Sequence, residues 1–370
     1  MNVPLLDVNA QNHPIANELR DAFDSVLESG RFIMGAEVEQ FEAEMADYLG
    51  AGHAIGVSSG TDAILLALMA LGIEAGDEVI CPSFTFFATA GCIARLGATP
   101  VFCDCHPDTF NMDFESAGEC VTEKTKAIIP VHLFGQSVDM DVCMAFASKH
   151  GLRVVEDTAQ SLGARFHGKA CGTIGELGTY SFFPSKNLGG LGDGGLVVTN
   201  DDGLADIAAK LRNHGMHPRY YHQMVGGNFR LDALQAALLR VKFKHYSSYV
   251  QHRQENAAYY SEKLGDCEGV LLPSEQHGYE HIWNQFTLRV MHGRRDELKN
   301  HLLESGIGCE IYYPVPMHKQ ECFSHLSAVN RTSLQTTDQL AEEVLSIPVY
   351  PELTRDQQDQ VVSAIQSFLS

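Results

Sequence analysis

Three short stretches of the sequence place polar residues directly after apolar segments of the kind that form buried strands. In "YSFFPSKNLGG" Lys186 follows an aromatic run and a proline, and in "LRVVEDTAQS" Asp157 follows two valines. In "GVSSGTDA" the small residues Ser59, Gly60 and Thr61 precede an apolar helical segment. An amine, a carboxylate and a small-residue turn can act on one ligand if the fold brings them together.

Lys186 can be interpreted in two ways. A lysine after a strand is most often a solvated surface charge. Pro184 and the glycines that begin at Gly189 favour the other interpretation, because they indicate a stiff, closely approached backbone that aims the side chain. An amine held in this way can form a Schiff base with an aldehyde, and it can take up a proton as a general base.

The turn in "GVSSGTDA" can also be interpreted in two ways. Ser59 is an ordinary candidate for the N-cap of the following helix. The free backbone amides of a helix start, beside residues as small as Gly60 and Thr61, also suit a phosphate group. The stretch is neither a Walker loop nor a G-x-G-x-x-G pattern, so its spacing alone leaves both interpretations open.

Asp157 ends an apolar segment, and Gln160 follows three residues later. The carboxylate of Asp157 could cap the next turn of the chain, which is the common role of such a residue. It could instead hold a positive charge inside a pocket, since an adjacent carboxylate favours the charged form of a cationic group. These residues alone do not decide between the two roles.

The three groups together match the requirements of one cofactor, pyridoxal 5′-phosphate. The turn at 59–61 would bind its phosphate, and Asp157 would keep its pyridine nitrogen protonated. Lys186 would bind its aldehyde and later move the substrate's Cα proton. Phe86 in "SFTFFATA" is a candidate to stack on the ring, and the alternative is that all three phenylalanines of this stretch belong to the core.

To act together, these groups must lie at one edge of a sheet, and the sequence predicts such a sheet. From residue 53 to residue 199 short apolar strands alternate with helical segments, as in "HAIGVS" followed by "TDAILLALMALGI". This rhythm is typical of a mostly parallel sheet covered by helices on both faces. Ligands bind at the carboxyl ends of the strands in such α/β folds.

The remaining sequence predicts a second domain. Residues 231–264 form one long helical stretch, which we interpret as a spine between two domains. Beyond it "NQFTLRV" and "GCEIYY" predict strands, whereas "RRDELKNHLLESGI" and "TRDQQDQVVSAIQSFLS" predict helices. We therefore expect a large α/β domain with an N-terminal arm at residues 1–245 and a small α+β domain at residues 246–370.

Composition limits the partners of the chain. Its 370 residues carry a net charge of −21, and no run of lysine or arginine could bind a phosphate backbone, so we expect no nucleic-acid partner. The start lacks the features of a signal peptide and no stretch approaches the length of a membrane span, so we expect a cytoplasmic protein. The ten cysteines include no C-x-x-C, and "CDCH" is too small a ligand set for zinc, so we expect reduced thiols and no metal.

Numerous motifs resemble those of one enzyme family, the DegT/DnrJ/EryC1/StrS sugar aminotransferases. The resemblance runs nearly end to end and implies the fold-type-I architecture, in which the large domain holds a mostly parallel seven-stranded sheet between helices. The motifs occur in the family's order: "SGRFIMGAEVEQFE", "GVSSGTDAILLAL", "PSFTFFATA", "VHLFGQSVDM", "EDTAQSLGA", "YSFFPSKNLGGLGDGGLVVTND", "LRNHG", "GGNFRLDALQAA" and "YYPVPMH".

The resemblance implies a role for each residue that matches a family motif. Lys186 corresponds to the Schiff-base lysine and Asp157 to the partner of the pyridine nitrogen. Gln160 would lie by the ring and its 3-hydroxyl, with Phe86 stacked on the ring. The phosphate would be bound by Ser59, Gly60, Thr61 and Ser181. Asn228 corresponds to an asparagine that reaches the phosphate from the neighbouring subunit, so the resemblance implies a homodimer with shared active sites.

The resemblance also implies the reaction. Members with lysine rather than histidine at this position transfer an amino group, usually from glutamate, to a keto sugar carried by a nucleoside diphosphate. The cofactor passes through pyridoxamine 5′-phosphate in the half-reaction. Three motifs, which include "HIWNQFTLRV", are similar to those of members that aminate C3. Arg219, Arg230, Tyr313 and His318 are candidates to contact the nucleotide sugar.

Two alternatives to a nucleotide-sugar substrate stay open on the sequence. In the first, the acceptor is a cyclitol or aminoglycoside-precursor ketone, with the same fold and cofactor. In the second, the chain is a catalytically idle regulator that binds the cofactor or a sugar. An idle protein would be free to lose Lys186 or Asp157, and both residues are present.

Overall fold

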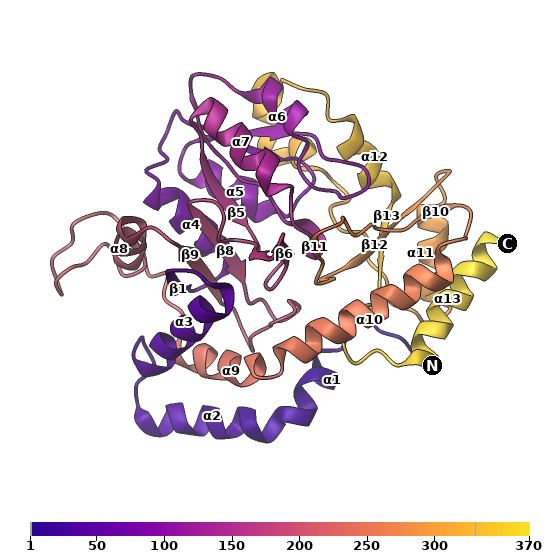
Figure 1. Ribbon diagram of the computed structural model, residues 1–370, viewed down its shortest axis with the longest axis horizontal. Coiled ribbons are helices and arrows are strands. Elements are labelled where there is room, and N and C mark those ends of the chain that lie inside the picture. The colour runs from indigo at the N-terminus through magenta and orange to yellow at the C-terminus, as the bar shows by residue number, and fades with distance from the viewer. Residues whose placement is uncertain (1, 330) are drawn as a thin grey trace.

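A computed structural model describes residues 2–329 and 331–370 of the chain and shows an α/β fold built on a seven-stranded sheet (Figure 1). The strand order is β1-β9-β8-β5-β4-β2-β3. The bounds are His53–Val57 for β1, Glu78–Pro82 for β2, Thr99–Cys103 for β3, Thr125–Ile128 for β4, Arg153–Asp157 for β5, Leu177–Ser181 for β8 and Gly195–Thr199 for β9. The predicted mostly parallel seven-stranded sheet is therefore confirmed.

Six of the seven strands run in the same direction. Strands β8, β5, β4, β2 and β3 pair in parallel, and β9 pairs antiparallel with both β8 and β1, so β1 runs with the main group. Asp157 is the last residue of β5, Ser181 is the last residue of β8, and Ser59 follows the end of β1. The carboxyl ends of these three strands meet at one edge of the sheet.

Helices cover both faces of the sheet, as the alternation of side chains along each strand requires. On one face α4 (Gly60–Ala70), α5 (Phe87–Arg95) and α8 (Asp202–Leu211) pack on a core that includes Val57, Val155 and Val197. On the other face α3 (Ala36–Leu49) and α9 (Ala233–Phe243) pack near Tyr180 and Val198, while α6 (Phe114–Cys120) and α7 (Met140–His150) cover Ile80 and Val154.

The C-terminal part of the chain has a hydrophobic core of its own around a three-stranded sheet ordered β10-β12-β13. In Figure 1 the long helix α10 (Tyr246–Leu264) joins this part to the large sheet. Its elements are β10 (Val270–Leu271), β12 (Phe286–Val290), α11 (Arg295–Glu304), η3 (Met317–Lys319), η4 (Glu321–Val329), α12 (Gln335–Glu343), β13 (Val344–Ile347) and α13 (Arg355–Leu369).

Short elements complete the fold. Strand β11 (Tyr279–Glu280) pairs with β6 (Arg165–Phe166), and β6 pairs with β7 (Lys169–Ala170). The remaining helices are α1 (Val8–Asn12), η1 (His13–Ile15), α2 (Ala16–Ser29) and η2 (Leu133–Gly135). Among the residues described, no helix is both long and apolar enough to cross a membrane.

Two sequence predictions about the C-terminal half are wrong in detail. The predicted continuous helix over 231–264 is divided into α9 and α10, with Lys244 and His245 between them. Packing overrides helix propensity here, because Tyr246 starts α10 fully buried and its hydroxyl donates to the carbonyl of Leu162. The predicted strand "GCEIYY" is only a single bridge from Glu310 to Ser346, and the chain turns at Tyr313, whose φ is +61°.

Candidate active site

The turn that carries Lys186 is held by backbone contacts on both sides. The Lys186 amide donates to the carbonyl of Phe183 at 2.8 Å, and the Gly190 amide donates to the carbonyl of Phe182 at 2.8 Å. A Cβ on Gly189 would collide with the backbone of Pro184, so the turn closes this tightly only with glycine at 189. The predicted stiff backbone around Lys186 is therefore present.

The neighbour of Lys186 fixes the turn to the C-terminal part of the chain. Asn187 is buried, and its side-chain amide donates to the carbonyl of Ile282 at 2.9 Å. Lys186 itself is half-buried. Burial lowers the pKa of Lys186 to about 8, although the charge of Asp157 acts in the opposite direction. At pH 7 about one amine in ten is therefore free of its proton, a far larger share than for an ordinary lysine of pKa 10.5, and the free amine is the form that acts as a nucleophile or general base.

Asp157 lies at the end of β5 with only 4% of its surface exposed. One carboxylate oxygen accepts from the Thr89 hydroxyl at 2.8 Å and the other from the Ala159 amide at 3.1 Å. Burial raises the pKa of Asp157, whereas the Thr89 and Ala159 hydrogen bonds and the charge of Lys186 lower it. The two hydrogen bonds leave each oxygen able to accept again, so a cation at this position would complete the site.

The N-terminus of α4 forms a close-packed cradle beside the end of β8. The Ser59 hydroxyl caps the helix by accepting from the Asp62 amide at 3.0 Å. The first amides of the helix, those of Gly60 and Thr61, have no partner inside it. A Cβ on Gly60 would lie 2.6 Å from the Cβ of Ser181, so only glycine allows this approach. The two interpretations of the turn are therefore compatible. Ser59 caps the helix, and the free amides of Gly60 and Thr61 can bind an anion.

Gln160 joins the two parts of the chain across the site. Its side-chain carbonyl accepts from the Phe134 amide at 2.8 Å, and its side-chain amide donates to the Tyr313 hydroxyl at 2.7 Å. The rings of Phe134 and Tyr313 are stacked with centroids 6.2 Å apart. Phe86 lies at the N-cap position of α5 without a side-chain capping bond and is 58% exposed, whereas Phe84 is fully buried. Phe84 therefore belongs to the core, whereas the exposed ring of Phe86 could stack on a cofactor. The interpretation that all three phenylalanines belong to the core does not hold.

These groups fit pyridoxal 5′-phosphate. The amide cradle suits the phosphate, Asp157 suits a protonated ring nitrogen, and the amine of Lys186 suits the aldehyde. The exposed ring of Phe86 suits a planar aromatic partner. The buried polar side chains of the site, the carboxylate of Asp157 and the amide of Gln160, and the half-buried amine of Lys186 are groups that such a ligand can use.

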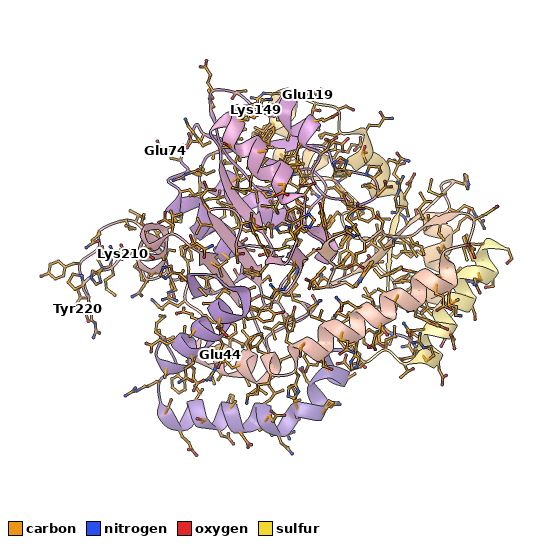
Figure 2. All side chains as sticks on the ribbon, viewed as in Figure 1. Glu44, Glu74, Glu119, Lys149, Lys210 and Tyr220 are labelled. Carbon is orange, nitrogen blue, oxygen red and sulfur yellow. The ribbon has the colours of Figure 1, made fainter. Side chains whose placement is uncertain are left out.

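Three further candidates, Asn228, Arg230 and Arg219, lie on the segment that leads from α8 to α9. Asn228 is exposed, although the carbonyl of its neighbour Phe229 accepts from the Ser58 amide at 3.0 Å beside the cradle. Arg230 donates to the side chain of Asn213 at 2.6 Å. Arg219 stacks over Tyr220 on a loop that projects beyond α8, where Figure 2 shows Tyr220 at the outer edge. The backbone of residues 228–230 therefore runs beside the cradle, since Arg230 also bridges Val57 at the end of β1, whereas Arg219 lies on the projecting loop.

His318 is engaged on both ring nitrogens. Its Nδ1 lies 2.7 Å from the hydroxyl of Ser83, and its Nε2 lies 3.2 Å from a carboxylate oxygen of Asp338. Burial lowers the pKa of His318, while Asp338 acts in the opposite direction. These contacts join His318 to the end of β2 and to α12, and its contact with the nucleotide sugar stays a prediction. Across residues 2–329 and 331–370, no three His, Cys, Asp or Glu side chains are grouped as metal ligands.

Sequence reasoning missed His132 and Glu156, which lie directly beside the site. Both side chains are fully buried, and His132 Nε2 lies 2.9 Å from Glu156 Oε2. A signal was present in the sequence, because a glutamate inside the apolar stretch "LRVVED" cannot be buried without a partner. What the sequence does not show is which residue supplies that partner.

Comparison with known proteins places the chain among sugar aminotransferases. Residues 13–366 match the DegT/DnrJ/EryC1/StrS aminotransferase family. The chain is 48% identical, over all of its length and 99% of the relative's, to a protein of Geobacillus stearothermophilus named pleiotropic regulatory protein. It is 43% identical, over 99% of its length and 98% of the relative's, to the UDP-N-acetyl-3-dehydro-alpha-D-glucosamine 3-aminotransferase of Acidithiobacillus ferrooxidans.

A solved structure agrees with this assignment. The crystal structure of S. venezuelae DesV in complex with a ketimine intermediate has a TM-score of 0.96 to this chain and 41% sequence identity. The match covers 100% of this chain and 99% of the DesV chain. The likeness therefore extends over both the large sheet and the C-terminal part.

Proposed function

The chain belongs to the DegT/DnrJ/EryC1/StrS aminotransferase family, and we propose that it transfers the amino group of glutamate to C3 of a 3-keto sugar carried by a nucleoside diphosphate. The chain is an aminotransferase. The observation that carries the aminotransferase chemistry is that Asp157 at the end of β5, the Gly60 cradle beside Ser181 at the end of β8, and the Lys186 turn that follows β8 lie at one edge of the sheet, where Asp157 and Lys186 are close enough for their charges to act on each other. The name of the 43%-identical relative supports amination at C3.

We propose that the cofactor is pyridoxal 5′-phosphate. Its phosphate would be held by the amides at 59–61 and the hydroxyl of Ser181, and its ring would lie between Asp157, Gln160 and Phe86. When bound, it supplies an electron-withdrawing ring that stabilises negative charge at the amine-bearing carbon of the substrate. In the first half-reaction Lys186 Nζ would accept the proton lost from the amine-bearing carbon of glutamate, and in the second it would donate a proton to the sugar carbon that gains the amino group. Asp157 would remain ionised opposite the ring nitrogen.

Half-reactions test the proposed substrates. The loaded protein is mixed with glutamate, the absorbance change of the cofactor is followed, and a panel of keto-sugar nucleotides is then offered. We expect 3-keto sugars to restore the starting spectrum and 4-keto isomers to react at least about tenfold more slowly. The reverse reaction, from a 3-amino sugar nucleotide to 2-oxoglutarate, is the control for unstable ketones. Faster reaction with the 4-keto isomer would contradict the assignment of C3, and reaction only with free cyclitol ketones would contradict a nucleotide-linked acceptor.

The name of the 48%-identical relative is a specific observation in favour of the regulatory alternative. A regulator of this fold would not need a lysine whose proton affinity is lowered by burial. The half-reaction with glutamate distinguishes an aminotransferase from a regulator. A protein that binds pyridoxal phosphate but shows no change in the cofactor's absorbance with glutamate is not a glutamate-dependent aminotransferase.

We further propose a homodimer whose two active sites are shared, and a division into domains at residue 245. The hydrophobic core of the C-terminal part supports the second domain, since almost all of its members lie between residues 257 and 365. Exposed apolar side chains support the dimer. Ile33, Phe183 and Leu191 are each about half exposed on the large domain, and Phe183 and Leu191 flank the Lys186 turn.

Mixing two variants that are impaired in different ways tests the shared site. Lys186→Ala removes the amine, and Asn228→Ala removes the residue that would reach the partner's phosphate, so we expect the Asn228 variant to bind the cofactor about tenfold more weakly. When the two variants are unfolded together and refolded, half of the dimers are hybrids with one intact site. Activity should return to about a quarter of the wild-type value, as measured by turnover at limiting cofactor. Activity no higher than the average of the separate variants would mean that each chain completes its own site.

A further inference from the structure

Glu156 is a buried carboxylate whose acceptor positions are all filled. Its Oε2 accepts from the Gly172 amide at 2.7 Å and lies 2.9 Å from His132 Nε2. Its Oε1 accepts from the amides of Ile174 and Gly175 at 2.8 and 2.7 Å. The side chain is fully buried. A carboxylate with four donors is stable as an anion in this environment, since unsatisfied charge is what makes burial costly.

The hydrogen bonds of His132 define its protonation. The Val138 amide donates to His132 Nδ1 at 2.9 Å, so this nitrogen carries no proton. The proton is therefore on Nε2, which donates to Glu156. His132 is a neutral imidazole with one acceptor and one donor, and both are used.

The pair is joined to the active site through the backbone. Glu156 and Asp157 are adjacent in β5, so their side chains point to opposite faces of the sheet. The His132 amide donates to the Asp157 carbonyl at 3.0 Å, and the Asp157 amide donates to the Pro130 carbonyl at 2.9 Å. The loop that starts at His132 also supplies Phe134, whose amide donates to Gln160. Movement of His132 would therefore displace Asp157 and also Phe134, which is hydrogen-bonded to Gln160 beside the site.

We propose that His132 and Glu156 are positioning residues of the active site. The neutral imidazole and the carboxylate anchor the end of β5 from the face opposite the cofactor, and they set the direction of the Asp157 carboxylate. Neither residue touches the cofactor or the substrate in this arrangement. The inference rests on the proposed role of Asp157 opposite the ring nitrogen.

Substitution of His132 tests the proposal through cofactor affinity. His132→Phe keeps a ring of similar size but leaves Glu156 without one donor and the Val138 amide without an acceptor. We expect the dissociation constant for pyridoxal phosphate, measured calorimetrically on the cofactor-free protein, to rise about tenfold. His132→Gln offers a side-chain carbonyl and an amide with the same pairing possibilities and should restore most of the affinity.

A matched carboxylate elsewhere controls for a general loss of stability. Glu78 is a buried carboxylate at the first residue of β2, on the amino edge of the sheet, and it pairs with Arg331 and Thr122. Glu78→Gln and Glu156→Gln should both lower the melting temperature, but only Glu156→Gln should weaken cofactor binding. Equal cofactor affinity in His132→Phe, Glu156→Gln and wild type would overturn the proposal.

If the variants fail to fold, NMR of the wild-type protein tests the hydrogen bonds of His132 on which the proposal rests. In protein labelled with ¹⁵N in the imidazole rings, NMR near neutral pH should show His132 with its proton on Nε2 only. A proton on Nδ1, or on both nitrogens, would overturn the proposal. A wild-type chain that bound no pyridoxal phosphate would contradict the proposed function instead, and the tautomer of His132 would be unaffected by that result.

Discussion

Lys186→Ala should lose turnover by about a thousandfold or more while the protein still binds its cofactor. Proton transfer by a positioned side chain contributes roughly 10²–10⁴-fold to rate, and this chain has no second amine beside Asp157 in the described structure to replace Lys186. The measurement is the steady-state rate with glutamate and a keto-sugar nucleotide, together with cofactor content by absorbance. Turnover within about tenfold of wild type would remove Lys186 from its assigned role.

Two controls sharpen this prediction. Lys149→Ala removes an exposed lysine from the last turn of α7 and should leave turnover unchanged. A small primary amine added to Lys186→Ala should recover part of the lost rate, because it supplies a proton acceptor in the space that the side chain vacates. Failure of the amine to recover any rate would point to a structural effect of the substitution.

Lys186 should also leave a signature on the stability of the cofactor-free protein. Its pKa in the folded state is about 8, below the ordinary 10.5, so the unfolded chain binds more protons between these values. The free energy of unfolding should therefore rise with pH from about 8 towards 10.5. Lys186→Met, which buries no charge, should be more stable than wild type near pH 7, and this difference should shrink as the pH rises through that window.

Asp157→Asn should weaken cofactor binding and reduce turnover by about a hundredfold or more. The amide is nearly the same size, and it can keep one of the contacts with Thr89 and Ala159, but it cannot hold a positive charge on the ring nitrogen. An unprotonated ring withdraws electrons poorly, so both affinity and rate should fall. The checks are the calorimetric dissociation constant and the single-turnover rate with glutamate.

Asp104 provides the matched control for Asp157. It is a buried carboxylate that follows β3 at the same edge of the sheet, and it accepts hydrogen bonds from the amides of Thr336 and Thr337 and from the Thr337 hydroxyl. Asp104→Asn should lower the melting temperature without changing cofactor affinity. If both substitutions weakened the cofactor equally, the effect of Asp157→Asn would be one of folding rather than of charge.

The sequence was sufficient to predict where the candidate cofactor-binding groups lie, because each of them follows the end of a strand. Lys186, Asp157 and the turn at 59–61 each follow an apolar run, and the direction of parallel strands then brings them to one edge. Helix α3 also has a local signal in the sequence, because Val38, Phe41, Met45 and Leu49 repeat at helical spacing and all four are buried.

The sequence was insufficient where tertiary contacts decide the conformation. The break between α9 and α10 contains neither glycine nor proline, and it depends on the burial of Tyr246. The turn at Tyr313 depends on stacking with Phe134 and on the hydrogen bond from Gln160, both of which join residues far apart in the chain. The partnership of His132 with Glu156 spans 24 residues, and nothing local specifies it.

The central claim is that Lys186 is the residue that binds the cofactor aldehyde. Protein loaded with pyridoxal phosphate is treated with borohydride, which makes the attachment permanent, and is then digested and analysed by mass spectrometry. We predict that the added mass lies on Lys186, with none on Lys242, the buried lysine of α9 whose pKa is also lowered to about 8. Attachment at Lys242 or any other lysine, or no attachment to a protein that still turns over, would contradict the account.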